Sequence, residues 1–504
     1  MYKGLIIQPF IILKMKFDDI INNFDSENSK NSYRDLNFFL EKLLEHYFEK
    51  NNKEYYKLDN PIFPFDYIVE TNLNNDLATP TVVELKIIPS SIAVKKVLEK
   101  FLLFKEKFHP EPRSIIIIST LNESEIEKFN RNKDYDFPYK LYGKNFINEL
   151  INDDIEYSKN LLINLYNIKF EEILSNNNQN WKDERSKQIE QLKLKYKEGN
   201  FSLLLGAGVS CDAKLPSWEQ LISSLLIKYF SETQNADNKF SQKSINEISE
   251  NFKDNYFNSA LLSARYLKKS LTKNNEPSDK FKNIIHEILY KTNTINRNSK
   301  LIEVIGRLCI PTRLRAHVDS IVTYNFDDLI EQKLKKLNLH HHVIPNALET
   351  YSIKELPIYH VHGFIPENPN NYDDYVGNEI VFSEDGYHKM YSDSYHWSNL
   401  VQLTHLREKS CLMIGLSMDD PNLRRLLDIV SNPSVESKHY AILKRVKQDS
   451  LISERSTEEE INLAKNFLQS HHHLQEAIFK DLGVNIIWYE EYSDIPDILE
   501  MLLH

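Results

Sequence analysis

The part of the chain after residue 200 alternates short apolar runs with longer segments in which apolar residues recur every three or four positions. Short apolar runs are typical of buried strands, and the three- and four-residue steps are typical of helices that cover a sheet. Strands that alternate with helices form a parallel sheet with helices on both faces. We therefore predict an α/β domain with a doubly wound, Rossmann-like parallel sheet over 200–504, with a helical insertion at about 230–310. Its expected strands are 201–205, 320–323, 357–362, 411–414, 439–443 and 484–488.

Glycines and polar residues stand at the ends of four of these expected strands. Gly206-Ala-Gly-Val-Ser210 follows the first strand, and Thr323-Tyr-Asn-Phe-Asp327 ends the second. His362-Gly363 ends the third, and Gly415 with Ser417 follows the fourth. Ligands of open parallel sheets bind at the carboxyl ends of the strands. The sequence therefore predicts one ligand site built from these segments.

The glycine turn favours a nucleotide as the ligand. Glycines let a backbone approach a ligand closely, and N–H groups at a helix start can hold a diphosphate without lysine or arginine. The formal net charge of −11 is therefore no objection to a dinucleotide. Cys211 stands where an ordinary dinucleotide fingerprint has its third glycine, which disfavours a plain dehydrogenase.

Each segment also has a purely structural interpretation. The glycines could form a tight strand-to-helix turn, and Asp327 or Asp328 could cap the helix that follows them. A lone histidine such as His362 is more often structural than catalytic. Because the segments coincide at strand ends of one sheet, we favour the functional interpretation, in which His362 accepts a proton from water or a ribose hydroxyl.

In this order the four segments resemble the sirtuin superfamily over roughly residues 201–504. The resemblance implies that NAD⁺ is the ligand, that Asn325 faces the nicotinamide ribose and that His362 is the general base. Gly415 and Ser417 would line the adenosine side. Gly206, Ala207, Gly208, Val209 and Ser210 would hold the diphosphate, and Asp327 would be a structural or ribose partner. Thr323 and Gly363 are the other implied contacts with NAD⁺.

Two departures separate this sequence from the protein deacylases of that superfamily. Deacylases carry a four-cysteine zinc ribbon, whereas this chain has only Cys211, Cys309 and Cys411, far apart, so we expect no zinc. The segment Leu215-Pro-Ser-Trp218 is similar to bacterial antiviral sirtuin-like effectors. That resemblance implies an NAD⁺ hydrolase that releases nicotinamide and ADP-ribose during anti-phage defence by abortive infection. It also implies control by a phage-derived trigger or a partner defence protein, and we expect a homo-oligomer.

Polar turn formers at 175–180 interrupt the apolar pattern, and we place the main domain boundary there. Residues 1–178 are expected to form a separate α/β domain, followed by a linking helix over 179–199. The order of its elements resembles restriction-endonuclease-like folds. The expected elements are a helix over 31–50, strands over 65–70 and 81–88, a helix over 91–108 and a strand over 114–119.

Asp66 and Glu84-Leu-Lys86 fit the spacing of a PD-(D/E)xK nuclease. Asp66 and Glu84 could hold Mg²⁺, and Lys86, on the same strand face as Glu84, could stabilise an attacking water. A Glu-x-Lys pair also occurs as an ordinary solvated strand face. A degenerate domain that senses nucleic acid or a partner is therefore an equal alternative to a nuclease.

Composition limits the remaining classes of function. The chain lacks an overall basic field, so any contact with nucleic acid must be local. No uncharged apolar run reaches the roughly 20 residues that cross a bilayer, and the scattered cysteines fit a reducing cytoplasm. We interpret His340-His-His342 and His471-His-His473 as polar surface. Besides an NAD⁺ hydrolase, two alternatives stay open: a metal-dependent nuclease regulated by a nucleotide-binding domain, and a non-enzymatic module of a defence complex.

Overall fold

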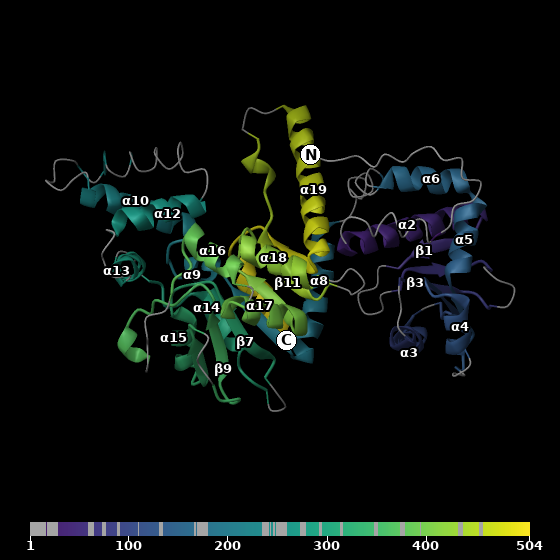
Figure 1. The fold of residues 1–504 in the computed structure, drawn as a ribbon, viewed down its shortest axis with the longest axis horizontal. Helices are drawn as coiled ribbons and strands as arrows, with labels where there is room; N and C mark the ends of the chain where they lie inside the picture. The colour runs from purple at the N-terminus through teal and green to yellow at the C-terminus, as the bar shows by residue number, and fades with distance from the viewer. Residues whose placement is uncertain are drawn as a thin grey trace. The chain divides into compact units, whose positions relative to one another are not determined.

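The computed structural model of the 504-residue chain divides into two compact units, Met1–Asn178 and Gln179–His504 without 432–436 (Figure 1). Of the boundary predicted at 175–180, residues 175–179 lie outside the described residues. The structure describes Phe17 and 29–504, except 59–64, 73–76, 88–90, 109, 131–134, 166–167, 169–179, 234–240, 242, 245–246, 248–259, 273–278, 292–294, 313–315, 347–350, 373–378, 394, 432–436 and 453–456.

The first unit is built on a mixed sheet of strand order β1-β2-β3-β4-β5. The first three strands are antiparallel neighbours, and β3, β4 and β5 run parallel. One core packs α2, α5 and α6 against the sheet, and a second core packs α3 and α4 with it. Its elements are α2 Ser29–Lys50, β1 Tyr55–Lys57, β2 Tyr67–Val69, β3 Thr81–Lys86, α3 Ser91–Lys107, β4 Ser114–Ser119, α4 Glu123–Asn130, β5 Tyr139–Tyr142, α5 Lys144–Asp153 and α6 Ile155–Ile163.

The second unit is built on a parallel sheet of order β12-β11-β10-β6-β7-β9-β8. Its strands are β6 Phe201–Leu205, β7 Val318–Thr323, β8 His341–Ile344, β9 Leu356–His360, β10 Ser410–Ile414, β11 His439–Lys444 and β12 Val484–Tyr489. Its helices are α8 Trp181–Glu198, α9 Ala207–Cys211, α10 Trp218–Thr233, α12 Ala260–Leu271, α13 Asp279–His286, the π-helix η1 Glu287–Lys291, α14 Lys300–Leu308, α15 Leu329–Lys336, η2 Pro369–Asn371, α16 Glu384–Ser392, α17 Trp397–Glu408, α18 Pro421–Val430, η3 Gln448–Ser450, α19 Glu458–Asp481, α20 Asp494–Glu500 and η4 Met501–Leu503.

Helices cover both faces of this parallel sheet. Leu203 and Leu205 of β6 join the core that contains α8, α14, α15 and α20, whereas Leu204 joins the core that contains α17, α18 and α19. Successive side chains of a strand point to opposite faces, which is why a continuous apolar run can serve two cores. The helices α10, α12, α13 and η1 form a further cluster beside the sheet (Figure 1). This is the doubly wound, Rossmann-like α/β arrangement that the alternating pattern predicts.

The order of strands creates a switch point beside β6. From β6 the chain proceeds to β7 and β9 on one side, and then returns to β10 on the other side of β6. Connections therefore leave β6 and β10 in opposite directions, which opens a crevice at their carboxyl ends. The four segments that the sequence analysis singled out follow β6, β7, β9 and β10, at this edge of the sheet.

Short strands at or near the sheet edges escape the sequence pattern. Strands β1, β5 and β8 were not predicted, because each has only three or four residues and several polar ones. Strand β9 ends at His360, two residues before the predicted end, so His362 lies in the turn after the strand. Among the described residues, no helix is both long and apolar enough to cross a membrane.

We predict that Gly415→Ala destabilises the protein much more than Gly483→Ala. Both glycines have a positive φ, +68° and +75°, so alanine costs roughly 1–2 kcal/mol at each. A Cβ at Gly415 would also lie 2.5 Å from the backbone nitrogen of Val209, whereas nothing lies within 4 Å at Gly483. This overlap adds about 1–3 kcal/mol. Urea-unfolding midpoints of the two variants measure the difference, and equal midpoints would contradict the close approach of the two turns.

Candidate functional site

The side chain of Asn325 joins the ends of strands β6 and β7. Its Nδ2 donates to the carbonyl of Gly206 at 3.0 Å and to Oγ of Ser210 at 2.9 Å. Its backbone N–H donates to Oγ1 of Thr323 at 3.1 Å. A carbonyl oxygen can only accept, so these contacts fix which side of the amide carries the nitrogen. The oxygen Oδ1 of Asn325 is buried and has no protein partner.

Asp327 supports this arrangement from the side. Its Oδ2 accepts the hydroxyl of Ser210 at 2.7 Å, and its Oδ1 accepts the N–H of Leu329 at 3.2 Å. Burial raises the pKa of Asp327 to about 6, although both hydrogen bonds oppose this shift. Asp327 therefore holds the start of α15, as the capping interpretation proposed, and also the serine that contacts Asn325.

His362 lies in a buried aromatic setting beside Asp420. Its ring packs edge-on against Tyr324 and Tyr387, with ring centres 4.8 and 5.7 Å away. Its Nε2 has no hydrogen-bond partner and lies 3.7 Å from Oδ2 of Asp420. Burial lowers the pKa of His362, and the charge of Asp420 opposes this shift. A neutral imidazole with an open nitrogen is the state that a general base requires.

Asp420 is a residue that the sequence analysis missed. Its Oδ1 accepts the N–H of Leu423 at 2.7 Å at the start of α18, and its Oδ2 accepts the hydroxyl of Tyr387 at 2.5 Å. The Asp-Pro pair at the start of a helix is the signal that could have drawn attention to this position. It indicates a helix cap, but it carries no information about a histidine 58 residues earlier.

The predicted glycines lie where two segments of backbone approach each other closely. The N–H of Gly208 donates to the carbonyl of Gly415 at 2.9 Å, and a Cβ at Gly206 would lie 2.5 Å from that same carbonyl. Gly363 has a φ of +104° and would place a Cβ 2.7 Å from the carbonyl of Glu379. Ala207 and Val209 lie in the short helix α9, and Ser417 is exposed on the turn after β10.

The arrangement offers an acceptor and a base at neighbouring strand ends. Both Oδ1 of Asn325 and Nε2 of His362 are buried polar atoms without partners. Leaving such atoms unpaired costs about 1–3 kcal/mol each, and a bound ligand or water can recover this cost. The two atoms can therefore accept hydrogen bonds from a polar ligand or from a water beside it.

In the first unit, the structure brings Asp66 and Glu84 together. Glu84 lies on β3 and is 2% exposed, and Asp66, just before β2, accepts the backbone N–H of the adjacent Leu85 at 2.6 Å. Burial raises the pKa of both carboxyl groups, and for Asp66 the neighbouring charge of Glu84 adds to the effect. The ammonium of Lys86 lies 2.5 Å from Oε1 of Glu84, whereas Oε2 has no partner. Glu84 is thus not a solvated strand face.

Asp66 and Glu84 supply fewer ligands than a complete metal site has. Among the described residues, no group of three or more histidine, cysteine, aspartate or glutamate side chains is arranged to hold a metal ion. Two carboxylates are compatible with Mg²⁺, which keeps several water ligands and is often bound through one or two carboxylates. Asp66 and Glu84 are therefore the residues that would hold a magnesium ion.

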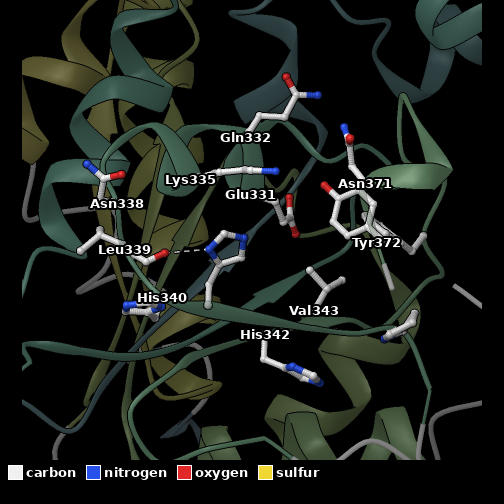
Figure 2. A pocket seen from close by; sticks show the side chains of 13 residues that line it. Glu331, Gln332, Lys335, Asn338, Leu339, His340, His342, Val343, Asn371 and Tyr372 are labelled. Atoms are coloured by element: carbon white, nitrogen blue, oxygen red, sulfur yellow. Dashed lines mark hydrogen bonds between the residues drawn. The ribbon is translucent and has the colours of Figure 1, made fainter. Parts of the chain in front are cut away.

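A cavity of about 800 Å³ lies apart from Asn325 and His362, between α15, β8 and η2 (Figure 2). Its walls include Glu331, Lys335, Tyr372 and the histidines 340–342. Only His340 of this triplet is exposed, so the prediction of a polar surface holds for one of its members. The same prediction was wrong for His472, which is 2% exposed because it packs against Trp488.

Comparison with known proteins assigns a family resemblance to the segment that carries Asn325 and His362. Residues 319–468 match the SIR2-like domain family. The NAD(+) hydrolase ThsA of Enterococcus faecium is 25% identical over 191 residues, which are 37% of this chain and 37% of that protein. The match thus spans little more than a third of that relative's length. The C-terminal region of this chain is therefore similar to SIR2-like domains.

Proposed function

We propose that the second unit cleaves NAD⁺ to nicotinamide and ADP-ribose. The observation that carries the proposal is the pair of open, buried atoms, Oδ1 of Asn325 and Nε2 of His362, at the ends of neighbouring parallel strands. The similarity to SIR2-like domains and to an NAD(+) hydrolase supports the same assignment. The glycine turn 206–210 would face the diphosphate, and Gly415 with Ser417 would face the adenosine.

Asn325 would orient the nicotinamide ribose and the attacking water. Because its Nδ2 donates to Gly206 and Ser210, its Oδ1 is the atom that would accept a hydrogen bond from the ligand. A fixed acceptor holds a water or ribose hydroxyl in one geometry, which lowers the entropic cost of reaching the transition state. Thr323 and Asp327 act through Asn325 and Ser210, since they hold the backbone and the serine in place.

His362 would take up the proton that the reaction releases. The bond between C1′ of the ribose and the nicotinamide nitrogen breaks, and its electron pair neutralises the pyridinium ring. The water oxygen bonds to C1′ and loses a proton to Nε2 of His362, which leaves nicotinamide and ADP-ribose. A neutral, buried imidazole suits this step because it does not repel the oxocarbenium-like transition state.

The setting of the activity is part of the proposal. Uncontrolled loss of NAD⁺ would harm a cell, so we place the enzyme in anti-phage defence, held inactive until a phage-derived trigger or a partner protein acts. We further propose a homo-oligomer as the active form. Continuous NAD⁺ cleavage by the purified, unassembled chain would contradict this control.

We also propose a second activity, a metal-dependent nuclease in the first unit. Its support is the buried pair of Asp66 and Glu84 with the open Oε2 of Glu84. These carboxylates would hold Mg²⁺, which would supply charge stabilisation at a phosphodiester, and Lys86 would orient the attacking water. A local basic contact to nucleic acid would be needed, since the chain has a net charge of −11.

We predict that Asn325→Ala and His362→Ala each lower kcat for NAD⁺ cleavage by about 100- to 10,000-fold. The physical reason is loss of the fixed acceptor in one variant and of the base in the other. Nicotinamide release, followed by chromatography, measures the rates in the presence of the activating condition. Asn399→Ala and His439→Ala are matched controls, because these residues are also buried and hydrogen-bonded but lie outside the site. Cleavage that survives both site changes would exclude the proposed mechanism.

We predict that Asp420→Asn moves the acid limb of the pH profile of kcat/KM to lower pH. His362 must be neutral to act as a base. The negative charge of Asp420 raises the pKa of His362, so its removal lets burial lower this pKa further. Tyr324 and Tyr387 also face the imidazole and stay unchanged, and asparagine can still cap α18. An acid limb that moves to higher pH would refute the assignment.

We predict that Mg²⁺ raises the thermal midpoint of the first unit in the full-length wild type but not in Glu84→Gln. A bound ion stabilises the state that binds it, and glutamine removes one charged ligand. Lys86→Met is expected to retain the stabilisation while losing any Mg²⁺-dependent cleavage of DNA. If Mg²⁺ stabilises Glu84→Gln as much as wild type, the pair does not hold the ion.

A further inference from the structure

His360, at the end of β9, lies between two hydrogen-bond acceptors. Its Nδ1 is 3.0 Å from the backbone carbonyl of Asn325, and its Nε2 is 2.7 Å from Oε1 of Glu331. The histidine is fully buried, and Glu331, on α15, is 2% exposed. Neither residue was singled out by the sequence analysis. Their contact joins α15, β9 and the turn after β7 behind the candidate site.

The two contacts restrict where the protons of His360 and Glu331 can lie. A carbonyl oxygen only accepts, so Nδ1 of His360 must carry a proton. The second nitrogen faces a carboxyl group, and a lone pair facing a carboxylate oxygen would be repulsive. Either an imidazolium faces a carboxylate, or a carboxylic acid donates to a neutral imidazole. In both cases the pair carries no net charge, and Glu331 keeps the proton on Nδ1 directed at Asn325.

The backbone carbonyl, the backbone N–H and Nδ2 of Asn325 are therefore all hydrogen-bonded, whereas its Oδ1 has no protein partner. His360 holds its backbone carbonyl, Thr323 its N–H, and Gly206 with Ser210 its amide nitrogen. We propose that His360 and Glu331 are positioning residues for Asn325 in NAD⁺ cleavage, an inference that rests on the proposed function. Neither contacts the substrate. They fix the backbone from which Oδ1 of Asn325 reaches the ribose or the water.

The cavity beside α15 gives small molecules from the solvent access to Glu331. Glu331 is among the side chains that line it, together with Gln332 and Lys335 (Figure 2). A cavity of about 800 Å³ is large enough for acetate or formate. When Glu331 is shortened to alanine, a small carboxylate can therefore enter and take the position of the missing group beside Nε2 of His360.

The first test compares His360→Asn with His360→Gln. The amide nitrogen of asparagine lies near the position of Nδ1, whereas that of glutamine lies near the position of Nε2. We expect kcat to stay within about threefold of wild type for asparagine and to fall about 10- to 100-fold for glutamine, with KM little changed in both. A purely structural histidine would give equal losses that follow the loss of thermal stability, and that result would overturn the proposal.

The second test uses chemical rescue of Glu331→Ala. We expect kcat to fall about 10- to 100-fold and to recover with acetate or formate, but not with chloride at the same ionic strength. Glu331→Gln is expected to retain most activity, because its amide can donate to Nε2 of His360. Loss of activity in Glu331→Gln equal to that in Glu331→Ala, together with absence of rescue, would refute the role of the pair.

A spectroscopic readout separates this inference from the proposed function. If the activated wild type does not cleave NAD⁺, the proposed function fails. Whether Glu331 orients His360 toward Asn325 is then tested by nuclear magnetic resonance. The signal is the low-field proton resonance of Nδ1–H of His360 in protein with ¹⁵N-labelled histidine. This resonance should be present in wild type, absent in His360→Asn and shifted or broadened in Glu331→Ala. An unchanged resonance in Glu331→Ala would overturn the inference by itself.

Discussion

The hydrogen bonds of Asn325 connect the ends of three parallel strands. Its amide reaches the turn after β6, its backbone follows β7, and its carbonyl is held by the last residue of β9. Parallel strands end at one edge of a sheet, so residues distant in the sequence can meet there. The orientation of this one side chain is supported by Ser210 and, through Ser210, by Asp327.

The polar groups around Asn325 and His362 are buried in pairs that compensate one another. Glu331 and His360 share protons without leaving a net charge, and Asp327 is held by a hydroxyl and a backbone N–H. An uncompensated charge would cost several kcal/mol in such an interior. Against this background, Oδ1 of Asn325 and Nε2 of His362 differ, because both are buried and neither has a protein partner.

The elements that could be predicted are those with strong local patterns. Apolar runs such as 201–205 and 439–443 predicted strands that the structure contains, since a strand buried on both faces needs a continuous apolar run. The short strand β8, with its two histidines, has no such pattern. Asp420 and Glu331 were missed for a different reason, because a carboxylate near a helix start indicates a cap or a solvated face whatever lies opposite it.

The sequence by itself determined the alternation of strands and helices, the glycine turns and the placement of Asn325 and His362 at strand ends, whereas the structure showed that β9 stops two residues before His362. Local periodicity and backbone freedom are properties of neighbouring residues, so they can be read without a fold. Only the tertiary structure decided that His360 faces Asn325 and Glu331, and that Asp420 faces His362. These contacts depend on the order of the strands in the sheet and on the packing of α15 and α18, which no local pattern encodes.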